Sequence, residues 1–241
     1  MLKGEQVTKY FGGLAALKNV NFVIRSKEIV GLIGPNGAGK TTLFNCISGV
    51  YRPTSGRIIF RGEDITGKEP HEICRMGIGR TFQIVKPFPN MTVLENVMVG
   101  ALYGRKYMGM NSARREAEYW VEFVGLGEKK YTLAKSLILA DRKALEIARA
   151  LATYPELILL DEVAAGLNPS ELLRAMNLIK NIRDKLGITV FWVEHVMRAV
   201  MKVAERIIVL HHGEKIAEGT PREIASNQKV IDAYLGEKYI F

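Results

Sequence analysis

The chain has 241 residues, of which 48% are hydrophobic and 24% are charged, a composition typical of a globular domain and not of a disordered or fibrous chain. No apolar run reaches the roughly 20 residues that span a bilayer, and no signal peptide is evident, so we expect a cytosolic protein. The net charge of +9 permits a nucleic acid, an anionic membrane or a nucleotide as partner and selects none of them. Cys46 and Cys74 lack metal-ligand spacing and are expected to be reduced thiols.

The first third of the chain is expected to be rich in β-strands. Alternating apolar residues predict strands at 2–8 and 20–25, and the segment 9–13, with two aromatics and two glycines, is predicted to be the turn between them. A glycine-bounded run at 56–62 predicts another strand. The apolar run at 28–33 predicts a short buried strand that leads directly into a glycine-rich segment.

This glycine-rich segment fits the pattern of a phosphate-binding loop and is followed by helical spacing at 41–47. Glycines allow consecutive backbone N–H groups to point inward, and the start of a helix attracts an anion. Lys40 would reach the β- and γ-phosphates, and the Thr41 hydroxyl would bind Mg²⁺. The nucleotide-binding residues predicted here are Gly34, Pro35, Asn36, Gly37, Ala38, Gly39, Lys40, Thr41 and Thr42.

The middle of the chain is predicted to be helical. Helices are expected at 92–99, 112–124 and 141–152, the first with Thr92 as its N-cap. We therefore expect one domain, 1–241, in which a helical subdomain at about 91–155 is inserted into a nucleotide-binding core formed by about 1–90 and 156–241.

The remaining third returns to alternating strands and helices. Strands are predicted at 157–160 and 189–193, a helix at 170–185 between Pro169 and Gly187, and a hairpin at 206–217. This alternation predicts an α/β fold with a largely parallel sheet covered by helices.

Polar residues follow the two buried strands of this last third. Asp161 is placed to hold Mg²⁺ through water, and Glu162 to orient and deprotonate an attacking water. His195 follows the strand at 189–193, where such sheets bind ligands, and would hydrogen-bond the γ-phosphate. Gln83 would contact both Mg²⁺ and the attacking water. Alone each signal is weak, but together with the phosphate-binding loop they predict a Mg²⁺-dependent nucleoside triphosphate hydrolase.

The order of these motifs resembles the ATP-binding subunits of ABC transporters over essentially the whole chain. The motifs are, in order, GPNGAGKTT, RTFQ, ALEIARAL, LILLDE, AAGLNP and EH. The branch that the chain resembles most is that of the branched-chain amino acid importers. The resemblance implies a P-loop NTPase core with a mostly parallel sheet, an N-terminal antiparallel β subdomain and an inserted helical subdomain.

The resemblance also implies roles and partners. Phe11 would stack on adenine, with Tyr10 as the alternative; Gln83 would lie in the Q-loop, Glu162 would be the catalytic base, Asn168 would lie in the D-loop and His195 would be the switch histidine. Two such subunits, identical or different, would sandwich two ATP molecules head to tail. A membrane permease would dock near the Q-loop on the cytoplasmic face of the membrane, and a solute-binding protein would act indirectly.

Two positions depart from the family pattern. The signature motif, which would contact the partner's nucleotide, should be close to LSGGQ, and this chain has Leu137, Ile138, Leu139, Ala140 and Asp141. Ile138 lacks the hydroxyl that would bond the γ-phosphate, and Val163 stands where the family usually has proline. A low-turnover subunit in a heterodimer is therefore an alternative to a full transport ATPase. A nucleic-acid ATPase is a weaker alternative, because there is no long heptad insertion or second ATPase domain, and no nucleic acid is expected. The cargo stays open between branched-chain and other amino acids or other small solutes.

Overall fold

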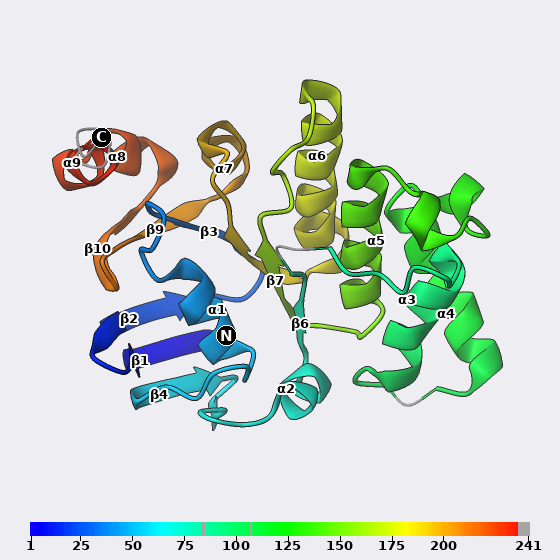
Figure 1. The fold of residues 1–241 in the computed structure, drawn as a ribbon, viewed down its shortest axis with the longest axis horizontal. Helices are drawn as coiled ribbons and strands as arrows, with labels where there is room; N and C mark the ends of the chain where they lie inside the picture. The colour runs from blue at the N-terminus through cyan, green and yellow to red at the C-terminus, as the bar shows by residue number, and fades with distance from the viewer. Residues whose placement is uncertain (83–84, 107, 236–241) are drawn as a thin grey trace. The chain divides into compact units, whose positions relative to one another are not determined.

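The structure is a computed structural model that describes residues 1–82, 85–106 and 108–235 (Figure 1). The chain forms two compact units. The first unit combines Met1–Ile73 with Thr189–Phe241, and the second consists of Cys74–Ile188. In the part of the chain that is described, no helix has both the length and the apolar character needed to cross a bilayer.

An antiparallel sheet forms the N-terminal part of the first unit. Its strands, in spatial order, are β2 (Leu14–Ile24), β1 (Leu2–Phe11), β4 (Ser55–Phe60) and β5 (Glu63–Asp64). The predicted strands are confirmed: β1 and β2 are longer than expected, and β4 ends two residues earlier than expected. The predicted turn at 9–13 is wrong for its first three residues. Phe11 pairs with Leu14, so only Gly12 and Gly13 turn. Gly12 has a φ of 57°, which glycine adopts without the strain of a Cβ, and two residues therefore suffice for the turn.

The second sheet of this unit carries the strand that precedes the glycine-rich segment. Its strands, in order, are β10 (Glu214–Gly219), β9 (Arg206–His211), β3 (Ile29–Ile33) and β8 (Thr189–Val193). β3 runs parallel to both β8 and β9, and every residue of β3 and β8 is buried, as expected for strands covered on both faces. Phe191 of β8 packs its ring 5.1 Å from that of Phe44 and 6.1 Å from that of Phe22.

Helix α1 (Lys40–Ile47) follows β3, and three further helices lie near the C-terminal strands: α7 (Met197–Val203), α8 (Pro221–Ala225) and α9 (Gln228–Leu235). The last three, of seven, five and eight residues, were not predicted from the sequence. They pack against the sheet through a buried cluster that includes Val200, Ile207, Ile224 and Val230. Burial in this cluster, and not helix propensity, stabilises such short helices.

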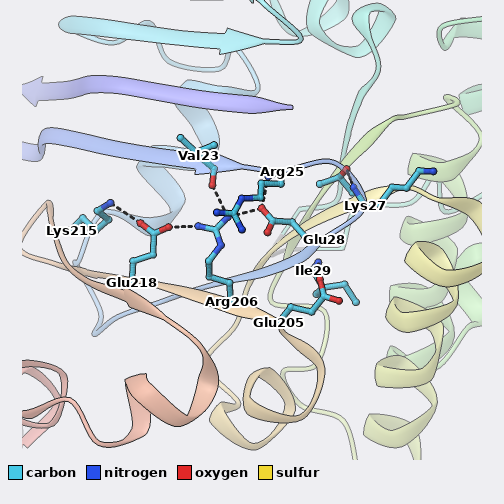
Figure 2. A network of polar contacts seen from close by, with 10 residues as sticks. Val23, Arg25, Lys27, Glu28, Ile29, Glu205, Arg206, Lys215 and Glu218 are labelled. Atoms are coloured by element: carbon cyan, nitrogen blue, oxygen red, sulfur yellow. Dashed lines mark hydrogen bonds and ion pairs between the residues drawn. The ribbon is translucent and has the colours of Figure 1, made fainter.

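A polar network ties the strand ends of the first unit together (Figure 2). The Arg206 guanidinium donates to the backbone carbonyl of Val23 at 2.7 Å and to the Glu28 carboxylate at 2.5 Å, and it also pairs with Glu218. The Lys215 ammonium group forms an ion pair with the Glu218 carboxylate at 2.7 Å. Arg206 therefore links the ends of β2, β9 and β10 and the residue that precedes β3 through charge-assisted hydrogen bonds.

The second unit contains a parallel pair of strands and a group of helices (Figure 1). The strands are β6 (Ile78–Arg80) and β7 (Leu157–Asp161). Helix α2 (Pro70–Met76) precedes them in the chain and contains the boundary between the two units, at Ile73 and Cys74. The helices are α3 (Val93–Tyr103), α4 (Met110–Phe123), α5 (Leu139–Leu151) and α6 (Pro169–Leu186), with 3₁₀ turns at Gly127–Lys129 and Ala134–Ser136. The predicted N-cap Thr92 is confirmed, because Thr92 and Glu95 form a capping box. The predicted α/β fold class is confirmed, whereas the subdomain boundaries at about 90 and 156 stay a prediction.

The two cysteines are free, as the sequence predicts. Cys46 lies buried in α1, and burial raises the pKa of its thiol to about 11. Burial also raises the pKa of Cys74 in α2. Both groups are therefore protonated and unreactive near neutral pH.

Candidate functional site

The glycine-rich segment connects β3 to α1 in a turn that only glycine can make. Gly34 has a φ of 151°, and a Cβ there would lie 2.1 Å from the carbonyl oxygen of Leu210. Gly39 has a φ of 101°, and a Cβ there would lie 2.5 Å from the carbonyl oxygen of Ala16. Gly39 is also the N-cap of α1 and has no side chain to accept from the first N–H groups of the helix. The start of α1 is thus a set of donors with a positive dipole, suited to an anion.

The ammonium group of Lys40 is held at the same turn. Lys40 is only 5% exposed, and its Nζ donates to the carbonyl oxygens of Gly34 and Pro35, both at 2.7 Å. Thr41, next along α1, has an exposed side chain. The loop therefore places an ammonium group, a hydroxyl group and backbone donors within one turn of chain, which is the donor set that a nucleotide's phosphates and their Mg²⁺ require.

The two candidate adenine-stacking residues lie next to each other on β1, where side chains alternate between faces. Phe11 is 41% exposed, and its ring lies 5.2 Å from that of Tyr51. The Lys9 ammonium group lies 5.1 Å from the Phe11 ring centroid. Tyr10 instead lines a polar cavity with Thr8. The face of β1 that carries Phe11 is therefore the candidate adenine-binding surface. Tyr51 is part of this aromatic surface and was not predicted from the sequence.

His195 follows β8 in the first unit, one residue after the buried Glu194. The Glu194 carboxylate accepts a hydrogen bond from the backbone N–H of His195 at 3.0 Å, and the His195 side chain is exposed. The structure thus puts Phe11, the phosphate-binding loop and His195 in one unit. The remaining candidates that the structure describes belong to the second unit.

Asp161 ends β7 and is 2% exposed. The Arg80 guanidinium forms an ion pair with its carboxylate at 3.3 Å, and the backbone N–H of Asp161 donates to the Thr81 hydroxyl at 3.0 Å. The same guanidinium lies 4.9 Å from the ring centroid of Phe82. Arg80 and Thr81 were not assigned a role from the sequence. They orient the candidate Mg²⁺ ligand, as outer-shell groups commonly do.

Glu162 follows at the turn after β7 and is half-buried. Its φ is 51°, in the left-handed region that a residue with a long side chain rarely adopts. Its carbonyl oxygen accepts from the Lys143 ammonium group at 2.6 Å and from the backbone N–H of Ala165 at 3.4 Å. The backbone that carries the candidate base is thus held in a defined and strained conformation.

The signature-like segment forms the start of α5, two residues earlier than the sequence predicts. Ile138 is the N-cap of this helix and is 58% exposed, and Leu139 is 47% exposed. An isoleucine cannot accept from the helix N–H groups as serine would, at a cost of about 0.5–2 kcal/mol to the helix start. Leu137 is buried, whereas Asp141 lies in the first turn and pairs with Lys129 at 2.5 Å. Donors and dipole remain, but the hydroxyl of the family motif is absent.

Asn168, the candidate D-loop residue, is the N-cap of α6. Its side-chain oxygen accepts from the backbone N–H groups of Ser170 and Glu171, both at 3.0 Å, and Glu171 accepts in return from the Asn168 backbone. Pro169 is the first helical residue, so α6 begins one residue earlier than the sequence predicts. Gln83, the candidate Q-loop residue, lies outside the described residues.

Comparisons with known proteins place these motifs in a family. The family model of the ABC transporter matches residues 17–165, and a model described as a branched-chain amino acid ATP-binding cassette transporter matches residues 214–240. The high-affinity branched-chain amino acid transport ATP-binding protein LivG of Salmonella typhimurium is 44% identical over 240 residues, which cover 94% of each chain. Two solved cassettes also match. The ADP conformation of MJ1267, an ATP-binding cassette of an ABC transporter, has a TM-score of 0.88 and 34% identity, covering 98% of each chain. A dimeric post-hydrolysis state of MJ0796 bound to ADP and Pi has a TM-score of 0.82 and 31% identity, covering 92% of this chain and 99% of that one.

The fold and the phosphate-binding loop define a P-loop NTPase of the α/β class. The chain belongs to the family of ABC transporter ATP-binding subunits. The predicted family, the predicted fold and the prediction of an ATP-binding, ATP-hydrolysing cassette are therefore confirmed. The roles of individual residues stay predictions.

Proposed function

We propose that this chain is the Mg²⁺-dependent ATPase subunit of a membrane importer for branched-chain or other amino acids. The observation that carries the ATPase part is the turn from β3 to α1, where Lys40 and the first N–H groups of the helix converge. Support for the cargo is the 44% identity with a branched-chain amino acid transport protein over 94% of the chain, together with the match at 214–240.

The residues fit Mg²⁺ as the ion that accompanies ATP. Thr41 offers an exposed hydroxyl and Asp161 a carboxylate oriented by Arg80, and Gln83 joins them by resemblance. Among the described residues, no group of three or more His, Cys, Asp and Glu side chains could hold a metal ion. A site with few protein ligands is suitable for Mg²⁺, because this ion keeps water and phosphate oxygens in its coordination shell. When bound, the ion would neutralise charge on the β- and γ-phosphates.

Each candidate residue has one task in the proposed reaction. Phe11 stacks on adenine, and Lys40 holds the phosphates through its ammonium group. Glu162 accepts a proton from the attacking water, and His195 hydrogen-bonds the γ-phosphate. The barrier is lowered by positioning and by electrostatic stabilisation, since phosphoryl transfer needs little covalent help from the protein.

The proposed partners are those of an importer. A second ATP-binding subunit, identical or different, would complete the site, and the dimeric MJ0796 cassette supports such an arrangement. Permease subunits would hold the cassettes at the cytoplasmic face of the membrane, and a solute-binding protein would deliver the cargo. A second candidate function is a low-turnover subunit in a heterodimer, which the exposed Ile138 at the N-cap of α5 favours.

The test is hydrolysis by the assembled transporter in lipid vesicles, with the chain purified together with its own permease subunits. We expect leucine, presented with the solute-binding protein, to raise the rate of ATP hydrolysis several-fold, because cargo drives the closing of the cassettes. A sugar presented in the same way is the control and should not raise the rate. Equal rates with leucine, the sugar and no solute would contradict the proposed cargo.

A further inference from the structure

We propose that Lys143 is a positioning residue that fixes the catalytic conformation of Glu162 through its backbone. Lys143 belongs to α5 and is 8% exposed, and its Nζ donates to the carbonyl oxygen of Glu162 at 2.6 Å. The inference rests on the proposed role of Glu162 as base. Lys143 itself touches no reacting atom in this scheme and acts only through the backbone of Glu162.

The backbone at Glu162 needs such support. A φ of 51° is strained for a glutamate, and strain of this kind persists only where neighbouring contacts over-determine the conformation. A flip of the peptide after Glu162 changes ψ of Glu162, and relaxation of its strained φ together with this flip would swing the side chain. The Lys143 ammonium group and the Ala165 N–H both bind this carbonyl oxygen, so together they resist the rotation.

The residue after Glu162 makes the lysine contact more important. No side-chain ring constrains the φ angle of Val163, whereas the ring of a proline at this position would fix φ. Val163 is buried, 4% exposed, so packing supports this turn as well, but packing without direction does not set the carbonyl orientation. A short charge-assisted hydrogen bond does set it.

The contact also joins two functional segments of the second unit. Lys143 lies in the second turn of α5, the helix that begins at the signature-like segment. Glu162, the candidate base, directly follows β7. A displacement of α5 is therefore passed to Glu162 through one hydrogen bond. In this way α5, whose N-terminus departs from the family's signature motif, remains linked to the candidate base Glu162.

The first experiment compares Lys143→Met, Lys143→Arg and the native full chain in steady-state ATP hydrolysis. Methionine keeps most of the length but donates no hydrogen bond, so we expect kcat to fall about tenfold with KM for ATP within about twofold, because only the base is misplaced. Arginine can donate to the same carbonyl and should restore at least half of kcat. Lys180→Met on α6, an exposed lysine of the same unit, is the matched control and should leave both constants unchanged.

A merely structural role would give a different pattern. If Lys143→Met lowers the melting temperature and raises KM while Lys143→Arg fails to restore kcat, or if kcat does not change, the proposal is wrong. The variant is measured well below its melting temperature so that both outcomes can be read from folded protein.

A double variant separates this inference from the role of Glu162. In a Glu162→Gln background, Lys143→Met should change the residual rate by less than about twofold, since the base through which Lys143 acts is already absent. A further tenfold loss in that background would overturn the proposal. If instead Glu162→Gln alone leaves turnover intact, the proposed base is wrong, and this outcome is distinct from the failure of Lys143.

Discussion

Glu162→Gln is expected to lower steady-state ATP hydrolysis by about 10²- to 10⁴-fold, the usual contribution of a general base, while ATP binding is retained. Glutamine has nearly the same shape and volume but cannot accept the proton from water. Because Glu162 lies in the turn after β7 and its carbonyl oxygen accepts from Lys143, the substitution of its side chain should leave the fold unchanged. Initial rates of phosphate release and equilibrium titration with ATP measure the two quantities.

A matched control for this variant is Glu118→Gln on α4. The Glu118 carboxylate pairs with Arg114 at 3.7 Å across one turn of the helix surface, and such pairs contribute little to stability. Turnover of the control should equal that of the native chain. Native-like turnover in Glu162→Gln would remove Glu162 from the role of base, whereas lost binding would show that the substitution disturbed the nucleotide site.

Lys40→Met is expected to weaken ATP binding about 100-fold, because an ammonium group that hydrogen-bonds charged phosphates is worth up to about 3 kcal/mol. Lys40 is held at the turn between β3 and α1 by the carbonyl oxygens of Gly34 and Pro35, so little side-chain freedom is lost when phosphate binds. Titration with a fluorescent ATP analogue gives the dissociation constant. The difference should be smaller for an adenosine ligand without phosphates.

The control for Lys40→Met is Lys202→Met, which removes an exposed lysine of α7 in the same unit. It lowers the net charge equally and should not change the affinity for ATP. An unchanged dissociation constant in Lys40→Met would mean that the turn binds phosphate through its N–H groups alone, and the proposed role of the lysine would then be wrong.

Local patterns allowed much of this protein to be predicted from its sequence. The phosphate-binding loop is recognisable because its glycines, lysine and threonine are contiguous, and the strands that precede Asp161 and His195 are uninterrupted apolar runs. The predicted N-cap Thr92 lies three residues before a glutamate, which is a local signal too. Such features depend on neighbours in sequence.

Contacts between distant residues could not be predicted in the same way. Arg80 and Asp161 are 81 residues apart, and nothing in either segment alone indicates that they pair. The same holds for Lys143 and Glu162, and for the ring contact between Phe11 and Tyr51. The turn expected at 9–13 is wrong because pairing with β2 keeps Phe11 in the strand, a tertiary effect that outweighs local turn propensity.

The molar mass of the Glu162→Gln protein tests the central claim most directly. This claim is that the chain is a cassette whose altered signature segment still supports dimerisation around ATP. Light scattering is done with saturating ATP and then with ADP, after binding of both nucleotides has been confirmed. We predict a mass of twice the 26.9 kDa of the chain with ATP and of one chain with ADP. One chain's mass with both nucleotides would contradict the claim and favour a different second subunit.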